Sequence, residues 1–191
     1  MKMQSTELII GNFLLLLTSI LYSVWWGTSF KPPGGYHGSR KGTILLLAMF
    51  GSGIGGTIVA LIGATSVPER HFSVWLILLV GILVYFILLI ISRFLFNRRI
   101  TPELIVLMGI CFLMVVEGDA LYSNGTFSIT AIFILAIVLV MVFVLNLLCY
   151  MNYYVVSEHA AYTMGLVPLI TNTVFIAAID VLIILSWNGV I

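Results

Sequence analysis

The chain has 191 residues, of which 62% are hydrophobic and 8% are charged, and its formal net charge is +1. A soluble domain carries about 25% charged residues, so this composition predicts an integral membrane protein. A near-neutral chain without a basic stripe lacks the counterion release on which nucleic-acid binding depends. Two cysteines are too few for a secreted domain held together by disulfides. We therefore expect membrane lipids as the surroundings and no nucleic-acid partner.

Long runs without Asp, Glu, Lys or Arg recur along the chain, and most reach the roughly 20 apolar residues of a membrane crossing. The fourth span is interrupted by acids, but Thr101-Pro102-Glu103 is a typical helix start, and Asn124-Gly125 indicates a turn after it. We predict one all-α transmembrane domain over residues 1–191, a compact bundle of six transmembrane helices. The helices are expected at about 8–28, 43–65, 71–95, 102–121, 127–153 and 161–187.

Basic residues in the connecting loops predict how the bundle faces. Cytoplasmic loops of membrane proteins are enriched in Lys and Arg. The connections after the first and third predicted helices hold six basic residues, and the other side holds only Lys2 and Arg70. The six are Lys31, Arg40, Lys41, Arg93, Arg98 and Arg99. This asymmetry places both termini on the outer side of a multi-pass protein of the cell membrane. Trp25 and Trp26 are then expected in an aromatic belt at the inner interface.

Small residues repeat along the second predicted helix. Ser52, Gly56, Ala60 and Ala64 occur every four residues and share one stripe of the helix surface. Small side chains let two helix backbones approach closely in lipid, where burial of apolar surface does not drive association. A glycine-rich phosphate site would instead need a preceding strand and basic partners. The stripe therefore predicts close helix packing.

Four acids are expected toward the outer face: Glu7, Glu117, Asp119 and Asp180. A charged group within a span costs several kcal/mol unless it has a partner or water, so each is a functional hypothesis. Glu117 and Asp119 diverge by about 200° around one helix, which predicts that one faces the bundle and the other the headgroups. The alternative is that these acids extend to the interface or cap a turn, and we favour it for Asp119.

Neutral polar residues complete a candidate pocket. Asn12, Asn146, Asn172 and Thr173 lie within predicted spans, where such groups often hydrogen-bond one helix to another. We favour that role for each of them, and Asn12, Asn172 and Thr173 are also candidates for lining a pocket with the acids. The predicted pocket for a substrate or ion consists of Glu117, Asp180, Thr173, Asn172 and Asn12, with Asp119 and His71 as secondary members.

Groups for catalysis or metal binding are sparse. His71 and Glu69 are near each other in sequence, but no two His or Cys residues have the spacing of metal ligands. Cys111 and Cys149 have no nearby base that would activate a thiol. We expect no metal, no cofactor and no enzymatic activity.

Three classes of function remain compatible with these features. The first is a transporter or channel-like protein with an outward-facing acidic and polar pocket for a cation, a proton or a small solute. The second is a non-catalytic membrane subunit or sensor whose intramembrane acids engage a partner. The third is an intramembrane enzyme that modifies lipids, which lacks a recognisable catalytic set. Six helices are few for alternating access, so a transporter of this size is expected to be a homo-oligomer or part of a larger membrane complex.

Overall fold

Six α-helices make up the architecture of the computed structural model, which describes residues 2–30, 38–68, 70–97, 101–153 and 155–187. They are α1 (Lys2–Ser29), α2 (Arg40–Thr65), α3 (Val74–Phe96), α4 (Thr101–Ser123), α5 (Ile129–Tyr153) and α6 (Glu158–Trp187). Each contains a stretch long and apolar enough to cross a membrane. The predicted all-helical class with six candidate spans is confirmed, and it supports a multi-pass membrane protein.

The helix ends differ from the sequence predictions where local hydrogen bonds decide them. Helix α2 begins earlier than predicted because the Ser39 hydroxyl accepts a hydrogen bond from Gly42 N at 3.0 Å and caps the helix. The predicted Asn124-Gly125 turn after α4 is confirmed, with Gly125 at a φ of 76° that favours glycine. Asn124 Oδ1 accepts a hydrogen bond from Thr126 N at 2.9 Å and closes this turn.

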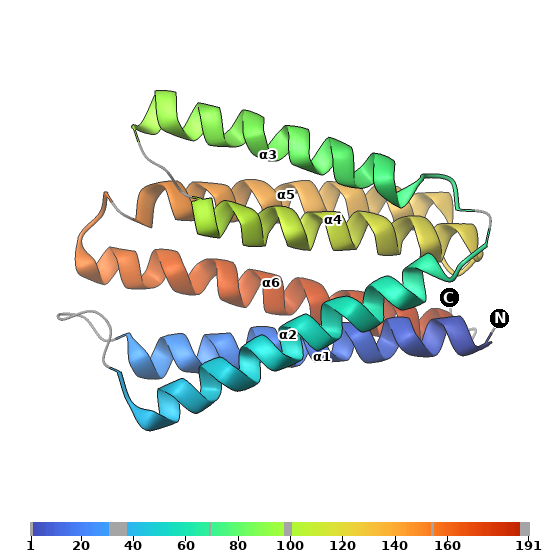
Figure 1. Ribbon diagram of the computed structural model, residues 1–191, viewed down its shortest axis with the longest axis horizontal. Coiled ribbons are helices and arrows are strands. Elements are labelled where there is room, and N and C mark those ends of the chain that lie inside the picture. Colours follow the sequence, from blue (N-terminus) through green and yellow to red (C-terminus); the bar gives the residue numbers. More distant parts are fainter. Residues whose placement is uncertain (1, 31–37, 69, 98–100, 154, 188–191) are drawn as a thin grey trace.

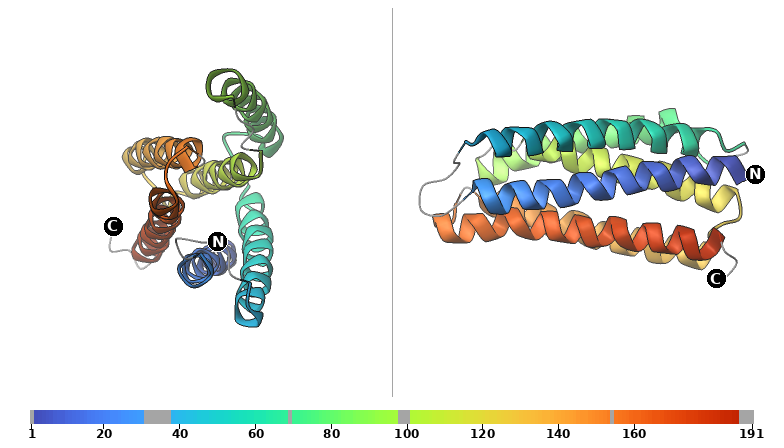
Figure 2. Two further views of the ribbon diagram at one scale, coloured as in Figure 1. Left: turned by 90° about the vertical axis from the view of Figure 1, so that its left-hand side faces the viewer. Right: turned by 90° about the horizontal axis from the view of Figure 1, so that it is seen from below.

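Consecutive helices run antiparallel, and both termini lie at the same end of the bundle (Figure 1). Five helices form a closed ring through the contacts α1–α2, α2–α4, α4–α5, α5–α6 and α6–α1. We call these five helices the helix ring. Helix α3 lies outside it and packs mainly on α4, as the end-on view in Figure 2 shows. The bundle is therefore less compact than predicted, because one of its six helices does not contribute to the ring.

The core of the ring differs between its two ends. At the end that holds the termini, aliphatic residues such as Leu8, Leu113 and Ile183 form the main cluster. At the opposite end, Trp25, Trp26 and Leu169 form an aromatic cluster. Large apolar side chains also cover much of the outer surface, which is the arrangement expected of a protein surrounded by lipid.

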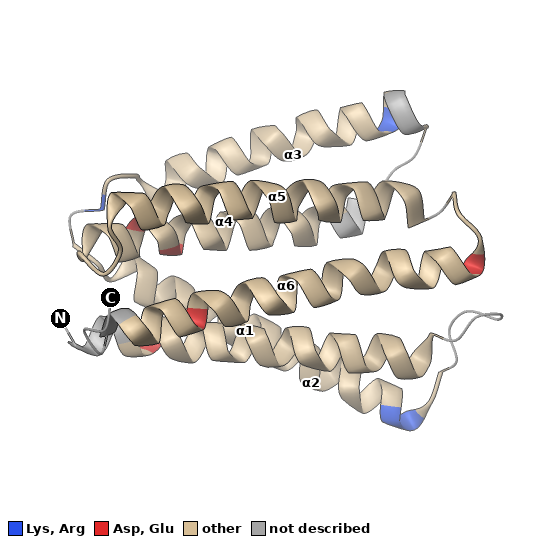
Figure 3. Ribbon diagram, turned by 180° about the vertical axis from the view of Figure 1, so that it is seen from behind, with Lys and Arg blue, Asp and Glu red and all other residues tan. Residues whose placement is uncertain are grey.

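Charged residues are separated along the bundle. Figure 3 shows acidic positions of α1, α4 and α6 at the end that holds the termini, and basic positions of α2 and α3 at the opposite end. Glu158, the first residue of α6, is an acid at the basic end, and Arg70 follows α2 at the acidic end. Several of the acids therefore lie at one depth in the ring.

Candidate functional site

A hydrogen bond between α1 and α4 crosses the helix ring. Asn12 Nδ2 donates to Glu117 Oε2 at 2.9 Å, and the two side chains are 0% and 1% exposed. Helices α1 and α4 are not neighbours in the ring, so this bond lies in its interior. The same Nδ2 donates to the Leu8 carbonyl oxygen at 3.2 Å. The predicted pocket residues Asn12 and Glu117 are thus brought together, although 105 positions separate them in sequence.

Asp180 of α6 approaches this pair from another side of the ring. Its side chain is 7% exposed, and α6 holds it at the same end of the ring at which α4 holds Glu117. Within the described residues, neither carboxyl oxygen of Asp180 has a hydrogen-bond partner. We refer to Asn12, Glu117 and Asp180 as the acid layer.

The acid layer is rich in acceptors that lack donors. Four of its oxygens are buried without a hydrogen bond among the described residues: Asn12 Oδ1, Glu117 Oε1, Asp180 Oδ1 and Asp180 Oδ2. An unpaired buried polar atom costs about 1–3 kcal/mol, and a charged one costs more. These four oxygen atoms are not accessible to solvent. The predicted outward-facing pocket is therefore shut in this structure, and its acceptors are suited to a species that donates hydrogen bonds or carries positive charge.

Neutral polar groups form a second layer deeper in the ring. The hydroxyl groups of Ser19 on α1 and Thr173 on α6 are 2.7 Å apart, and Asn146 Nδ2 donates to Asn172 Oδ1 at 2.9 Å. Thr173 and Asn172 precede Asp180 by about two helical turns, or roughly 10 Å. These residues join α1, α5 and α6. We call them the neutral layer, and it continues the polar interior away from the acid layer.

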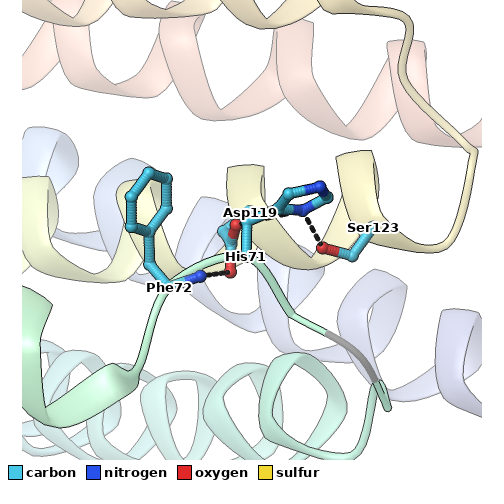
Figure 4. A network of polar contacts seen from close by, with 4 residues as sticks. All are labelled: His71, Phe72, Asp119 and Ser123. Carbon is cyan, nitrogen blue, oxygen red and sulfur yellow. Dashed lines mark hydrogen bonds and ion pairs between the residues drawn. The ribbon is translucent and has the colours of Figure 1, made fainter.

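Asp119 has a different role from Glu117, two residues earlier. Its carboxylate accepts a hydrogen bond from Phe72 N at 3.2 Å and lies 3.8 Å from His71 Nδ1. His71 Nδ1 also contacts the Ser123 hydroxyl at 2.9 Å, and Figure 4 shows the four residues together. The prediction that one of the two acids points to the headgroups was wrong, because Asp119 is buried and holds the segment between α2 and α3 against α4.

The stripe on α2 packs against α1 at short range. Ala60 is fully buried, and a Cβ atom added to Gly11 of α1 would lie 2.5 Å from Ala60 N. A Cβ atom on Gly56 would lie 3.0 Å from Gly11 O, and the hydroxyl groups of Thr18 and Ser52 are 2.7 Å apart. Ala64 is also fully buried. The two backbones therefore approach at positions where a larger side chain has no space.

Aromatic side chains fill the opposite end of the ring. Trp26 stacks on Phe30 with ring centroids 4.2 Å apart, and its Nε1 donates to the Tyr162 carbonyl oxygen at 3.2 Å. A side chain at Gly165 would collide with the Trp26 indole. Trp25 and Trp26 are both buried within the chain at this end of the ring, and their place at the inner interface stays a prediction. Their packing closes the interior beyond the neutral layer.

Sequence reasoning missed the glycines that receive these contacts. Gly11 and Gly165 each stand opposite a residue from another helix, and no repeat in the sequence marks them. The only signal is a single glycine within an apolar run, which is typical of a close approach but does not identify the partner. Gly63 extends the predicted stripe of α2 toward Leu8 in the same way.

The grooves on the outside of the ring are apolar. Two of about 310 and 380 Å³ lie between α3 and α4, and both include Gly81, Met108 and Phe112. No acid lines either groove. Among the described residues, no three His, Cys, Asp or Glu side chains are grouped to hold a metal ion.

Comparison with known proteins gives no further assignment. No protein-family model matches the sequence, and neither a curated protein nor a solved structure matches the chain. The acid and neutral layers inside the helix ring are therefore the features of the chain that bear on its function.

Proposed function

We propose that this chain is a small transport protein of the cell membrane, a transporter or channel-like protein that carries a proton or a small cation. The observation that carries the proposal is a set of four buried acid-layer oxygens that have no donor among the described residues and that lie inside a ring of apolar helices. Ionisable groups within a membrane span are rare, and they typically mark ion pathways or proton relays. The neutral layer supplies further polar groups along the same interior.

Passage of an ion requires the ring to open at its ends. The acid layer is covered at the end that holds the termini, and the aromatic cluster of Trp25, Trp26 and Leu169 fills the other end. The structure thus corresponds to a closed state of the proposed transporter. Helix α3 and the apolar grooves beside it leave a surface open to another subunit, and we propose that the transporter is a homo-oligomer or belongs to a larger complex.

We propose that the acid layer faces outward, with both termini outside. Arg40, Lys41 and Arg93 lie at the opposite end of the bundle, and enrichment of basic residues marks the cytoplasmic side. Cysteines at the exposed positions Ser128 and Ser157 test this orientation in a chain whose two native cysteines are replaced by alanine. An impermeant thiol reagent applied to intact cells should label the Ser128→Cys variant and spare the Ser157→Cys variant. The reverse pattern would overturn the orientation.

A flux assay tests the transport proposal. Purified protein is reconstituted into vesicles that contain a pH-sensitive dye or a sodium- or potassium-sensitive dye, and a gradient of one ion is applied at a time. We expect flux of one of these ions above that of empty vesicles. The Asp180→Asn and Glu117→Gln variants should reduce it at least tenfold, because each removes an acid-layer carboxyl. Glu158→Gln, which alters an exposed acid at the other end, is the matched control. Equal flux from all variants, or none from the parent chain, would contradict the proposal.

The second candidate is a non-catalytic membrane subunit or sensor. The exposed surface of α3 and the groove of about 380 Å³ beside it favour this function, since a partner helix could pack there. The acids are not the contact surface in that case, because the acid layer is buried within the chain. Absence of flux, together with recovery of a stoichiometric membrane partner, would favour the subunit over the transporter.

A further inference from the structure

Two unpaired oxygens of the acid layer belong to side chains that already share one hydrogen bond. Asn12 Nδ2 donates to Glu117 Oε2, while Asn12 Oδ1 and Glu117 Oε1 are buried without a hydrogen-bond partner in the described part of the chain. The Asn12 amide therefore has a hydrogen bond at its nitrogen and none at its oxygen, and the Glu117 carboxyl group has one at Oε2 and none at Oε1. Both unused atoms are acceptors in an ionised carboxylate and an amide, so neither can satisfy the other without a hydrogen atom.

The orientation of the Asn12 amide is determined by its neighbours. Its nitrogen faces two acceptors, Glu117 Oε2 and the Leu8 carbonyl oxygen, so exchanging Nδ2 and Oδ1 would set three oxygens against one another. The unpaired atom is consequently the amide oxygen, Asn12 Oδ1, which is a hydrogen-bond acceptor. Among the described residues, no side-chain or backbone donor reaches it.

Among the described side chains, no positive charge forms an ion pair with Glu117. The other ionisable groups at this end of the ring are Asp180 on α6, Lys2 and Glu7 on α1, Asp119 on α4, and Arg70 and His71 before α3. Asp119 already binds Phe72 N and lies near His71. The spanning part of α5 has no charged residue, and the charged residues of α2 and α3 lie at their far ends. Arg70, beyond α2, makes no ion pair with Glu117 in the part of the chain that is described. Burial of an isolated charge is costly, and a group in this position takes up a proton instead.

We infer that Glu117 holds a proton on Oε1 and forms a cyclic acid–amide pair with Asn12. Asn12 Nδ2–H donates to Glu117 Oε2, and Glu117 Oε1–H donates to Asn12 Oδ1. One proton from water thus satisfies both unpaired atoms and leaves the pair without net charge. The inference rests on the proposed transport function in one respect, since it names the proton as the ion that the acid layer takes up.

Infrared spectroscopy of the whole chain in lipid vesicles tests the pair directly. At neutral pH we expect a carbonyl-stretch band of a protonated carboxyl that shifts when glutamate carboxyls carry a heavy carbon isotope and does not shift with labelled aspartate. Glu117→Gln should remove the band. The parent measurement needs no variant, so the test remains decisive even if a substitution prevents folding. Absence of a glutamate carboxyl band at neutral pH would overturn the inference.

Substitutions distinguish a proton from a bound cation. Glutamine at position 117 can donate to Asn12 Oδ1 and accept from Asn12 Nδ2, so Glu117→Gln should retain the melting temperature of the parent. Glu117→Leu removes both bonds and should lower it. An ionised Glu117 that binds a cation predicts instead that Glu117→Gln loses a stabilisation by sodium or potassium ions that the parent shows, and that result would overturn the inference.

The flux assay then separates the inference from the function on which it rests. Proton flux in the parent vesicles with the glutamate band present supports both. The band without flux of any ion supports the protonated pair and contradicts transport. Flux of sodium or potassium ions without the band supports transport and overturns the proton as its ion.

Discussion

Helices α3 and α4 pack side by side, yet they occupy opposite environments. None of the residues in the most apolar stretch of α3 is buried within the chain, compared with 56% for α4. Helix α4 holds Glu117 and Asp119, whereas the only charged residue in α3 is Arg93, in its last turn. In lipid, apolar side chains gain little by leaving the surface, so polarity and small size, more than hydrophobicity, mark the residues that face other helices. In this chain the helix outside the ring is one of the two most apolar helices, together with α5.

The largest loss of stability is expected from substitutions at the close contact between α1 and α2. Gly11→Ala places a methyl group within 2.7 Å of the backbone of Ala60, and a backbone cannot move aside as a side chain can. We expect a loss of about 3 kcal/mol or more in the free energy of unfolding, measured by denaturant titration in micelles. Gly51→Ala on α2 is the control, because nothing lies within 4 Å of the added atom. It should be neutral or slightly stabilising, since alanine favours a helix. Equal losses in the two variants would contradict the packing of α1 on α2.

The next effect compares leucines of α3 and α4. Leu113 on α4 is 4% exposed and Leu83 on α3 is 54% exposed. Leu113→Ala leaves a cavity in the core and should cost about 2 kcal/mol, whereas lipid fills the space left by Leu83→Ala and the cost should be below about 0.5 kcal/mol. Thermal unfolding of both variants in the same lipid checks the difference. A larger cost at Leu83 would mean that α3 is not outside the ring.

A smaller effect is expected at the contact between Asp119 and the segment before α3. Asp119→Ala removes the acceptor of Phe72 N and should cost about 1–2 kcal/mol. Asp119→Asn retains an oxygen acceptor and should lose less than half of that amount. The Phe72 amide hydrogen should exchange faster in the alanine variant. Unchanged exchange at Phe72 would show that the hydrogen bond does not hold this segment.

The smallest effect concerns the neutral layer. The Asn146–Asn172 pair should show a coupling energy of about 0.6 kcal/mol in a double-mutant cycle with leucine substitutions, as is typical of hydrogen bonds between helices in lipid. Ser92→Ala on α3 is the comparison. Among the described residues, its hydroxyl bonds only to Leu89 O of the same helix, so the variant should be neutral. A coupling energy of zero would indicate that the two amides do not contribute to association of α5 and α6.

Much of the fold could be predicted from the sequence because the spans are separated by short polar segments. The acids and amides of the pocket could be identified one by one, since each is an exception within an apolar run. Their pairing could not, because nothing in the sequence indicates that Asn12 meets Glu117 rather than Asp180. The position of α3 outside the helix ring also could not be predicted, because an apolar helix has the same sequence pattern whether lipid or protein surrounds it.

Residues at the helix ends show the same limit. Asp119 was expected to extend outward or cap a turn, and it binds the backbone of a segment that the sequence placed within the third helix. Trp26 was expected at the inner interface, and its packing against Gly165 of α6 was not predicted. Both differences depend on a partner from another helix, which helical periodicity does not specify.

The arrangement of α3 and α4 can be tested most directly by spin labels along both helices. Nitroxides are attached in turn at positions 77–88 and 105–116 of a chain diluted in lipid, and their collision rate with dissolved oxygen is measured. We predict a strong oscillation with the helical period along α4, high at Ile105 and Val106 and low at Leu107 and Leu113, and uniformly higher rates with a weak oscillation along α3. An equally strong oscillation along both helices, or high rates at Leu107 and Leu113, would contradict a helix ring that excludes α3 and encloses the acid layer.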